Sequence, residues 1–287
     1  MRIMVFLISL LIILFTSFCA TAQGLNLQES IKLFDQKQYE KAQVHFQSLF
    51  EKHPDHVDVA CYLAKSALAS GDYGKAVEVL EKAVKIDSTR GDCYYVLGLA
   101  YARTIPEVGV LKKMGVAKKM QGAMLSAVRL APDDSDVRIS LISFYLSAPG
   151  FAGGSLEEAK KHLAILKEQS PDRTFIIDGS VLEKEEKYPE AEAVFRKGVL
   201  EKRTPMNVFS LAGYLMRRKQ FEEAISLFNE FLAMDPGWQD PKKAGGYFML
   251  GLIYEARKMQ KESETAFRAS LALHPDPWME KEINNRL

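Results

Sequence analysis

Apolar positions along the chain recur at helical spacing, with polar residues between them. A short pattern, an aromatic residue followed three positions later by alanine, occurs at Tyr39–Ala42, Tyr73–Ala76, Tyr188–Ala191 and Phe221–Ala224. The alanines at 42 and 76 are 34 residues apart, and those at 191 and 224 are 33 apart. A period of this length indicates a chain built from one repeated supersecondary unit.

Each repeat is predicted to contain two helices. Prolines that would stop a helix follow the second apolar stretch at Pro54, Pro132, Pro171, Pro236 and Pro275. Small residues, such as Gly98 in a first helix and Ala191 in a second, would let paired helices cross closely. We therefore predict about seven stacked antiparallel helix pairs, with the residues from Pro277 onward forming a short C-terminal capping helix.

The last unit resembles the tetratricopeptide repeat family through Tyr247, Leu250, Gly251, Tyr254, Phe267 and Pro275. The chain departs from the pattern at Ser263, where alanine is usual, and at Ser88 and Arg203, where proline is usual. The resemblance covers nearly all of residues 23–287 and implies an all-α, right-handed α-solenoid. We expect residues 23–287 to form one solenoid domain.

The resemblance also implies a concave groove lined by the first helix of each pair. Its expected partner-binding residues are Tyr95, Leu99, Arg103, Ile139, Phe209, Met216, Arg217, Phe248 and Leu252, with Ser143, Leu146 and Glu255 nearby. Such an apolar and aromatic surface, dotted with arginine, suits an extended peptide or an amphipathic helix. The alternative is that several of these side chains are half-buried in the stack or covered by loops.

Three insertions interrupt the repeat. Residues 104–115 lie between the helices of the third unit and are expected to fold back on the solenoid, with a protruding apolar lip as the alternative. Residues 148–154 form a glycine-rich turn before Ser155 and Glu158, a capping-box pair that favours a structural role over anion binding. Residues 237–245 contain Trp238, which is expected to pack between the last two units rather than await a partner.

The first 22 residues have the three parts of a secretory signal: Arg2, an apolar run from Ile3 to Phe15, and small residues ending at Ala22. We expect cleavage after Ala22 and a periplasmic or secreted bacterial protein. The apolar run is shorter than the roughly 20 residues of a membrane-spanning helix, so a permanent anchor is the less favoured reading. Lipidation at Cys19 is disfavoured by the large Phe18 before it.

Two cysteines follow the signal, Cys61 and Cys93. Export would allow them to pair. However, both have apolar neighbours, and the repeat frame places them at different heights on neighbouring helices. We expect two unpaired, buried thiols.

Composition narrows the function classes further. Without Arg2, 37 basic residues balance 37 acidic ones (38 − 1 against 37), which leaves no excess charge to attract nucleic acid. The sequence contains no Cys-x-x-Cys zinc pair, no nucleotide loop and no catalytic motif. We therefore expect no metal, no cofactor and no enzyme activity. The prediction is an exported scaffold that binds protein partners in cell-envelope assembly; the alternative is a solute-binding subunit of a transport system that holds a small apolar acid or lipid.

Overall fold

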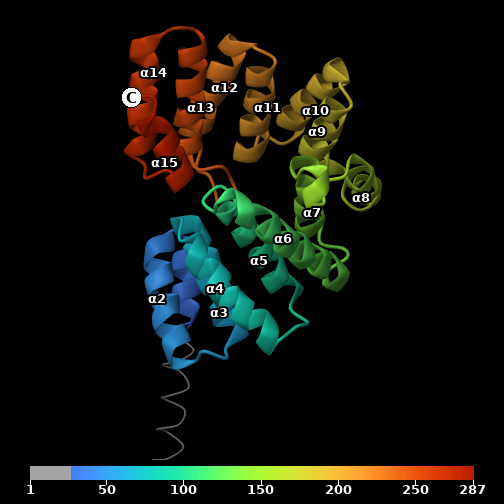
Figure 1. Ribbon diagram of the computed structural model, residues 1–287, viewed down its shortest axis with the longest axis vertical. Coiled ribbons are helices and arrows are strands. Elements are labelled where there is room, and N and C mark those ends of the chain that lie inside the picture. Colours follow the sequence, from blue (N-terminus) through green and yellow to red (C-terminus); the bar gives the residue numbers. More distant parts are fainter. Residues whose placement is uncertain (1–26) are drawn as a thin grey trace, which may run out of the picture. The chain divides into compact units, whose positions relative to one another are not determined.

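The computed structural model describes residues 27–287, and in that range it contains helices and no strand. Residues 27–35 are helical. The α-helices that follow are α2 (Tyr39–Lys52), α3 (Val57–Ser70), α4 (Tyr73–Ile86), α5 (Gly91–Thr104), α6 (Val110–Leu130), α7 (Ser135–Ser147), α8 (Leu156–Gln169), α9 (Phe175–Lys184), α10 (Tyr188–Glu201), α11 (Pro205–Arg217), α12 (Phe221–Ala233), α13 (Lys243–Ala256), α14 (Gln260–Leu271) and α15 (Pro277–Asn284) (Figure 1). Short 3-10 helices precede α8 (η1, Gly150–Ala152) and α9 (η2, Pro171–Arg173).

The chain divides into two compact units, one ending at Thr89 and one spanning Arg90–Leu287. In the first unit α3 packs against both α2 and α4. Its core includes Phe46, whose ring stacks on Tyr62 with centroids 5.3 Å apart and planes 15° apart. This unit supplies the first two predicted helix pairs.

The second unit contains five helix pairs, from α5/α6 to α13/α14, followed by α15 (Figure 1). Each pair also contacts the next, because α6 packs on α7, α8 on α9, α10 on α11 and α12 on α13. The predicted all-α architecture of consecutive stacked pairs, with a short helix after the last, is confirmed.

Glycines in the first helices explain how the two helices of a pair approach. A Cβ atom added at Gly98 would lie 2.6 Å from the Cε of Met124, and one at Gly251 would lie 2.4 Å from the Cε1 of Phe267. At Gly179 the same atom would lie 2.8 Å from the Phe195 ring. The large side chain one turn after the small residue of the second helix therefore occupies the space that the glycine leaves.

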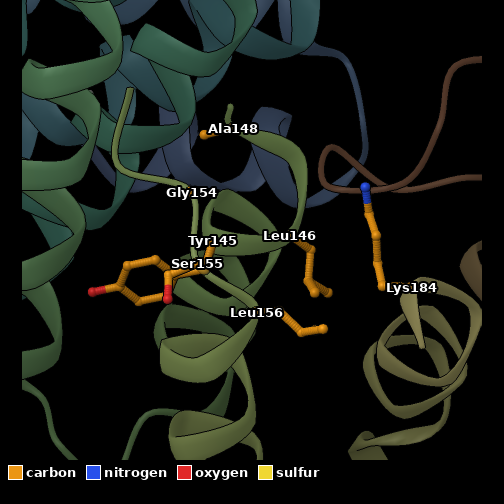
Figure 2. A pocket seen from close by; sticks show the side chains of 7 residues that line it. All are labelled: Tyr145, Leu146, Ala148, Gly154, Ser155, Leu156 and Lys184. Carbon is orange, nitrogen blue, oxygen red and sulfur yellow. The ribbon is translucent and has the colours of Figure 1, made fainter. Parts of the chain in front are cut away.

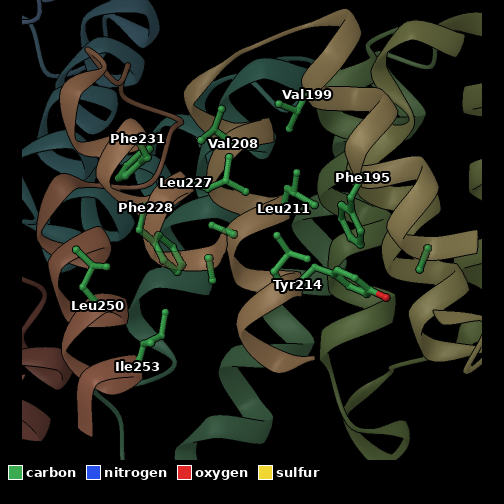
Figure 3. Close-up of a cluster of buried hydrophobic side chains, with 14 of the residues drawn as sticks. Phe195, Val199, Val208, Leu211, Tyr214, Leu227, Phe228, Phe231, Leu250 and Ile253 are labelled. Atoms are coloured by element: carbon green, nitrogen blue, oxygen red, sulfur yellow. The ribbon is translucent and has the colours of Figure 1, made fainter. Parts of the chain in front are cut away.

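Neighbouring pairs share one hydrophobic cluster, drawn in Figure 3. Its buried members run from α10 through α11 and α12 into α13 and α14: Ala191, Phe195, Val199, Val208, Leu211, Ala212, Tyr214, Leu215, Ala224, Leu227, Phe228, Phe231, Leu250, Ile253 and Ala266. The Tyr214 hydroxyl donates to the Tyr188 carbonyl at 2.7 Å, so the one phenol in this cluster is satisfied. No single pair could bury these side chains alone, which is the reason for stacking.

The turns within pairs reuse one backbone solution. The residue that ends the first helix takes a left-handed conformation at Lys37, Gly71, Glu186, Lys219 and Lys258. The φ angle at Lys219 is 60°, and the next amide, of Gln220, donates to the Leu215 carbonyl at 2.9 Å. This bond satisfies a carbonyl that the helix end would otherwise leave unpaired.

Two sequence expectations need correction. The insertion at 104–115 is only partly a loop, because α6 begins at Val110 and lengthens to 21 residues. Cys61 and Cys93, both buried, are disulfide-bonded, so the expectation of two free thiols is wrong: burial did not keep them reduced. The predicted signal, residues 1–22, lies outside the described residues. Among the described helices, none combines the length and hydropathy needed to span a bilayer.

The glycine-rich turn before α8 is a structured connection, as expected. The Ser155 hydroxyl accepts from the Glu158 amide at 3.2 Å, which is half of the predicted capping box. The other half is absent, because the Ser155 amide donates to the Tyr145 carbonyl at 3.0 Å and the Glu158 carboxylate pairs with Lys161.

Candidate functional site

The candidate site lies on the first helices of the second unit: α5, α7, α9, α11 and α13. Six of the predicted groove residues are half-buried: Tyr95, Leu99, Ile139, Phe209, Met216 and Leu252. Arg103 and Arg217 are exposed, whereas Phe248 is buried. The face is therefore mixed, and its neighbours decide which parts a partner can reach.

The α5 end of the face is covered by the loop between α12 and α13. Gln239, in that loop, donates its Nε2–H to the Tyr95 hydroxyl at 2.9 Å. Burial raises the pKa of Tyr95 to about 12, although a hydrogen bond with Ser140 acts in the opposite direction. Tyr95 is thus held within the chain's own packing and is a poor candidate for partner contact.

Arg103, at the end of α5, meets the beginning of α15. Its Nη1 lies 3.9 Å from Asp276 Oδ2, and Lys242 Nζ lies 3.2 Å from Asp276 Oδ1. Only 9 % of the Asp276 side chain is exposed, so this carboxylate is compensated by two cations at a nearly dry position. Burial, followed by repulsion from Asp276, raises the pKa of Glu107 in the same neighbourhood.

The α13 end of the face is covered by α15. Phe248 is 4 % exposed and forms a hydrophobic cluster with Phe267, Met279 and Ile283. Its ring meets Trp278 edge-on, with centroids 5.8 Å apart. Because α15 takes the place that the first helix of another repeat would occupy, Phe248 belongs to the core and offers no surface to a partner.

The α11 part of the face is more open. Phe209 packs edge-on against Phe231, with centroids 5.0 Å apart, so its ring is half-buried. Arg217 donates from Nε and Nη2 to the two carboxylate oxygens of Glu183, both at 2.8 Å. This two-point ion pair ties α11 to α9 and neutralises the guanidinium.

A cavity of about 230 Å³ opens between the ends of α7 and α9 (Figure 2). It is lined by Tyr145, Leu146, Ala148, Gly154, Ser155, Leu156 and Lys184. In Figure 2, Leu146 and Leu156 lie between Tyr145 and Lys184. Lys184 is exposed and makes no hydrogen bond or ion pair within the described residues. We define these seven residues as the α7–α9 pocket.

The chemistry of the α7–α9 pocket is that of binding. Two leucines offer an apolar wall, and Lys184 offers an uncompensated ammonium at its edge. Burial raises the pKa of Tyr145, so this phenol stays protonated at neutral pH. The pocket therefore suits an apolar group that carries a carboxylate beside it.

Sequence reasoning found Leu146 but missed Lys184. The signal was available, because shifting Arg217 back by the 33-residue spacing between Ala224 and Ala191 gives position 184. No groove residue was carried over for the fifth repeat, whose first helix is α9. The pocket itself also depends on Leu156 and Gly154 of an insertion, whose position the repeat pattern does not specify.

Comparisons with known proteins agree with this architecture. Models of the tetratricopeptide repeat match residues 33–94 and residues 209–276. No curated protein matches the chain in sequence.

Several solved structures are similar in fold. A tetratricopeptide repeat protein from Parabacteroides merdae has a TM-score of 0.64 at 12 % identity, over 93 % of this chain and 98 % of its own. A human IFIT1 dimer with PPP-AAAA has a TM-score of 0.63 at 17 % identity, over 92 % of this chain and 62 % of its own. The APC/C hetero-tetramer Cut9–Hcn1 has a TM-score of 0.58 at 16 % identity, over 90 % of this chain and 48 % of the matched chain. The repeat matches at two separate segments, together with stacked helix pairs over the whole described chain, make this chain a tetratricopeptide repeat protein.

Proposed function

We propose that this chain is an exported, non-enzymatic scaffold that binds a peptide or helical segment of a partner protein, and that the α7–α9 pocket is the centre of that interaction. The observation that carries the proposal is the combination of Leu146 and Leu156 with an unpaired Lys184 around one cavity. A tetratricopeptide repeat fold, which presents an extended face of parallel first helices, supports a role in protein–protein interaction.

The occupant that fits is a partner residue with an apolar side chain next to a carboxylate. The apolar group would gain from leaving water against the two leucines, and the carboxylate would pair with the Lys184 ammonium. Phe209 and Met216 on α11 extend the apolar surface beyond the pocket, since both remain half-buried rather than covered.

The solute-binding alternative requires Arg103 or Arg217 to hold a small acid. Both arginines already face carboxylates of the chain itself, Asp276 and Glu183 respectively. An incoming acid would have to compete with these partners, which favours the peptide scaffold over the solute-binding subunit.

Export is part of the proposal and is supported by two features. The first 22 residues have the composition of a secretory signal with cleavage after Ala22, and no other segment of the sequence has an apolar run of that length. The disulfide-bonded state of Cys61 and Cys93 is that of a protein in an oxidising compartment. Mass spectrometry of the N-terminus of protein purified from its native cells tests this part, with Gln23 as the expected first residue.

Peptide selection on the full chain tests the binding role. Peptides enriched from a random library should combine an aliphatic or aromatic residue with an adjacent Asp, Glu or free C-terminus. Lys184→Glu should weaken their binding at least tenfold, because it places like charges together, and Leu146→Ala should weaken it by removing the apolar wall.

The matched control is Lys281→Glu, which makes the same charge change at an exposed position of α15. It should leave peptide affinity within twofold of the wild type. Selected peptides whose affinity ignores both Lys184→Glu and Leu146→Ala would show that the pocket is not the binding centre.

A further inference from the structure

Helix α6 differs from the other second helices in charge. It spans 21 residues, the longest helix in the described part of the chain (Figure 1). It carries five cations, Lys112, Lys113, Lys118, Lys119 and Arg129, and no Asp or Glu. A chain with nearly equal numbers of basic and acidic residues has therefore separated its charges at this helix.

The cations of α6 are also unpaired. Lys112, Lys113, Lys118 and Arg129 are exposed and make no hydrogen bond or ion pair within residues 27–287. The neighbouring second helices behave differently: on α8, Lys167 pairs with Asp178 at 2.8 Å, and on α10, Arg196 pairs with Glu223. The chain thus compensates cations on α8 and α10 but leaves those of α6 available.

This charge arrangement does not help α6 to form. Lys112 and Lys113 lie in its first turn, where the positive end of the helix dipole disfavours cations. Like charges one turn apart also repel each other. A basic helix that lacks internal compensation is typical of a surface that meets an acidic partner.

One continuous face of α6 points away from its own repeat. The side chains that pack toward α5 include Ala117, Met120, Met124 and Ala127, all buried. On the opposite face lie Lys118, Leu125 and Arg129, at helical spacing, with Met114 one turn before Lys118. Met114 and Leu125 remain exposed at 46 % and 43 %, which gives the face apolar contacts between its cations.

Gly115 and Gly122 share this outward face, seven residues apart. A Cβ atom added at either would meet nothing within 4 Å, so packing inside the chain does not require glycine there. Glycine inside a helix is less stable than alanine. At these two positions its effect is to leave the helix backbone open to close approach from outside.

We propose that the outward face of α6, defined by Met114, Gly115, Lys118, Gly122, Leu125 and Arg129, docks an acidic helical segment of a partner protein. Glutamates or aspartates of that segment pair with Lys118, Arg129 and the first-turn lysines. Its apolar side chains contact Met114 and Leu125, and its backbone approaches over the two glycines. This surface is separate from the α7–α9 pocket, so the proposal does not depend on the groove.

An anionic membrane is the less suitable occupant. A helix that inserts into a lipid surface does so with its apolar face. The apolar face of α6 is already buried against α5, and only two apolar side chains remain outside. A complementary protein helix needs no more than these two contacts together with its charges.

The test uses two synthetic 21-residue helical peptides of alanine and leucine, one with glutamate at the flanking positions and one with lysine there. Fluorescence anisotropy with the full chain should show binding of the glutamate peptide and none of the lysine peptide, weakening as salt rises. Lys112→Glu with Lys118→Glu and Arg129→Glu should weaken binding at least tenfold. Lys261→Glu with Lys281→Glu and Arg268→Glu, an equal charge reversal on exposed positions of α14 and α15, should not.

A second variant separates docking from folding. Gly122→Leu introduces a good helix former into open space, so the melting temperature should not fall, yet peptide affinity should drop at least fivefold. The proposal is overturned if the glutamate peptide binds the charge-reversed α6 as well as the wild type. It is also overturned if phosphatidylglycerol vesicles bind through α6 while the glutamate peptide does not, because the surface would then be a membrane contact.

Discussion

The Gln239 side chain donates a hydrogen bond to the Tyr95 hydroxyl at 2.9 Å, although 144 residues separate them along the chain. Gln239 lies in the loop before the last helix pair, and Tyr95 lies on the first helix of the second unit. The Arg103–Asp276 contact joins the same two regions. Within this unit, the first and last repeats are therefore held together by polar contacts as well as by the stacked helices between them.

Asp276 is the centre of that connection. Asp276→Ala removes a carboxylate that faces both Lys242 and Arg103 and leaves two cations close together. We expect a loss of about 1–3 kcal/mol in the free energy of unfolding, the range for hydrogen bonds to charged groups. Urea unfolding followed by circular dichroism measures it. Glu280→Ala, at an exposed acidic residue of α15, is the matched control and should change stability by less than about 0.5 kcal/mol.

Phe248 provides a test of its corrected assignment. As a core residue beneath Trp278 and against Phe267, it should cost about 3–5 kcal/mol when replaced by alanine. Phe151, which is 78 % exposed, should cost less than about 0.5 kcal/mol in the same replacement. Guanidinium unfolding of both variants gives the comparison. Equal, small effects would mean that α15 does not cover α13 in solution.

Two glycines should respond to alanine with opposite signs. Gly251→Ala places a Cβ atom 2.4 Å from Phe267, so the pair α13/α14 must separate or the ring must move, at about 1–3 kcal/mol. Gly122→Ala meets no neighbour and should stabilise α6 by up to about 1 kcal/mol. Thermal unfolding of the two variants tests the sign directly. Destabilisation by both would contradict the open surroundings of Gly122.

The sequence predicted the crossings well, because they depend on local spacing. The alanines at 42, 76, 159, 191 and 224 are all fully buried, as their recurrence indicated. Phe209 and Phe248 look equivalent in the repeat pattern, yet only Phe248 is covered, because α15 follows its repeat and no such helix follows that of Phe209. The contact between Tyr95 and Gln239 depends on the rotation accumulated over several repeats, which no short motif records.

Glu185 should make stability depend on pH in the acid range. Hydrogen bonds from Lys160 and then Lys187 lower its pKa to about 2 from an ordinary value of 4.5. A lowered pKa in the folded state gives stability that is present above about pH 4.5 and is lost as the pH falls toward 2. Glu185→Gln should remove part of that dependence. The difference between its unfolding free energy and that of the wild type, measured from pH 6 to pH 2, should shrink as the pH falls. A constant difference would contradict the lowered pKa.

The central claim is that a partner segment docks at the α7–α9 pocket, and hydrogen–deuterium exchange of the full chain with and without a selected peptide tests it most directly. We predict that the peptide slows exchange at the end of α7, through the turn before α8 and at the end of α9, where Leu146, Leu156 and Lys184 lie. Protection confined to other helices, with these segments exchanging as fast as in the free chain, would contradict the account.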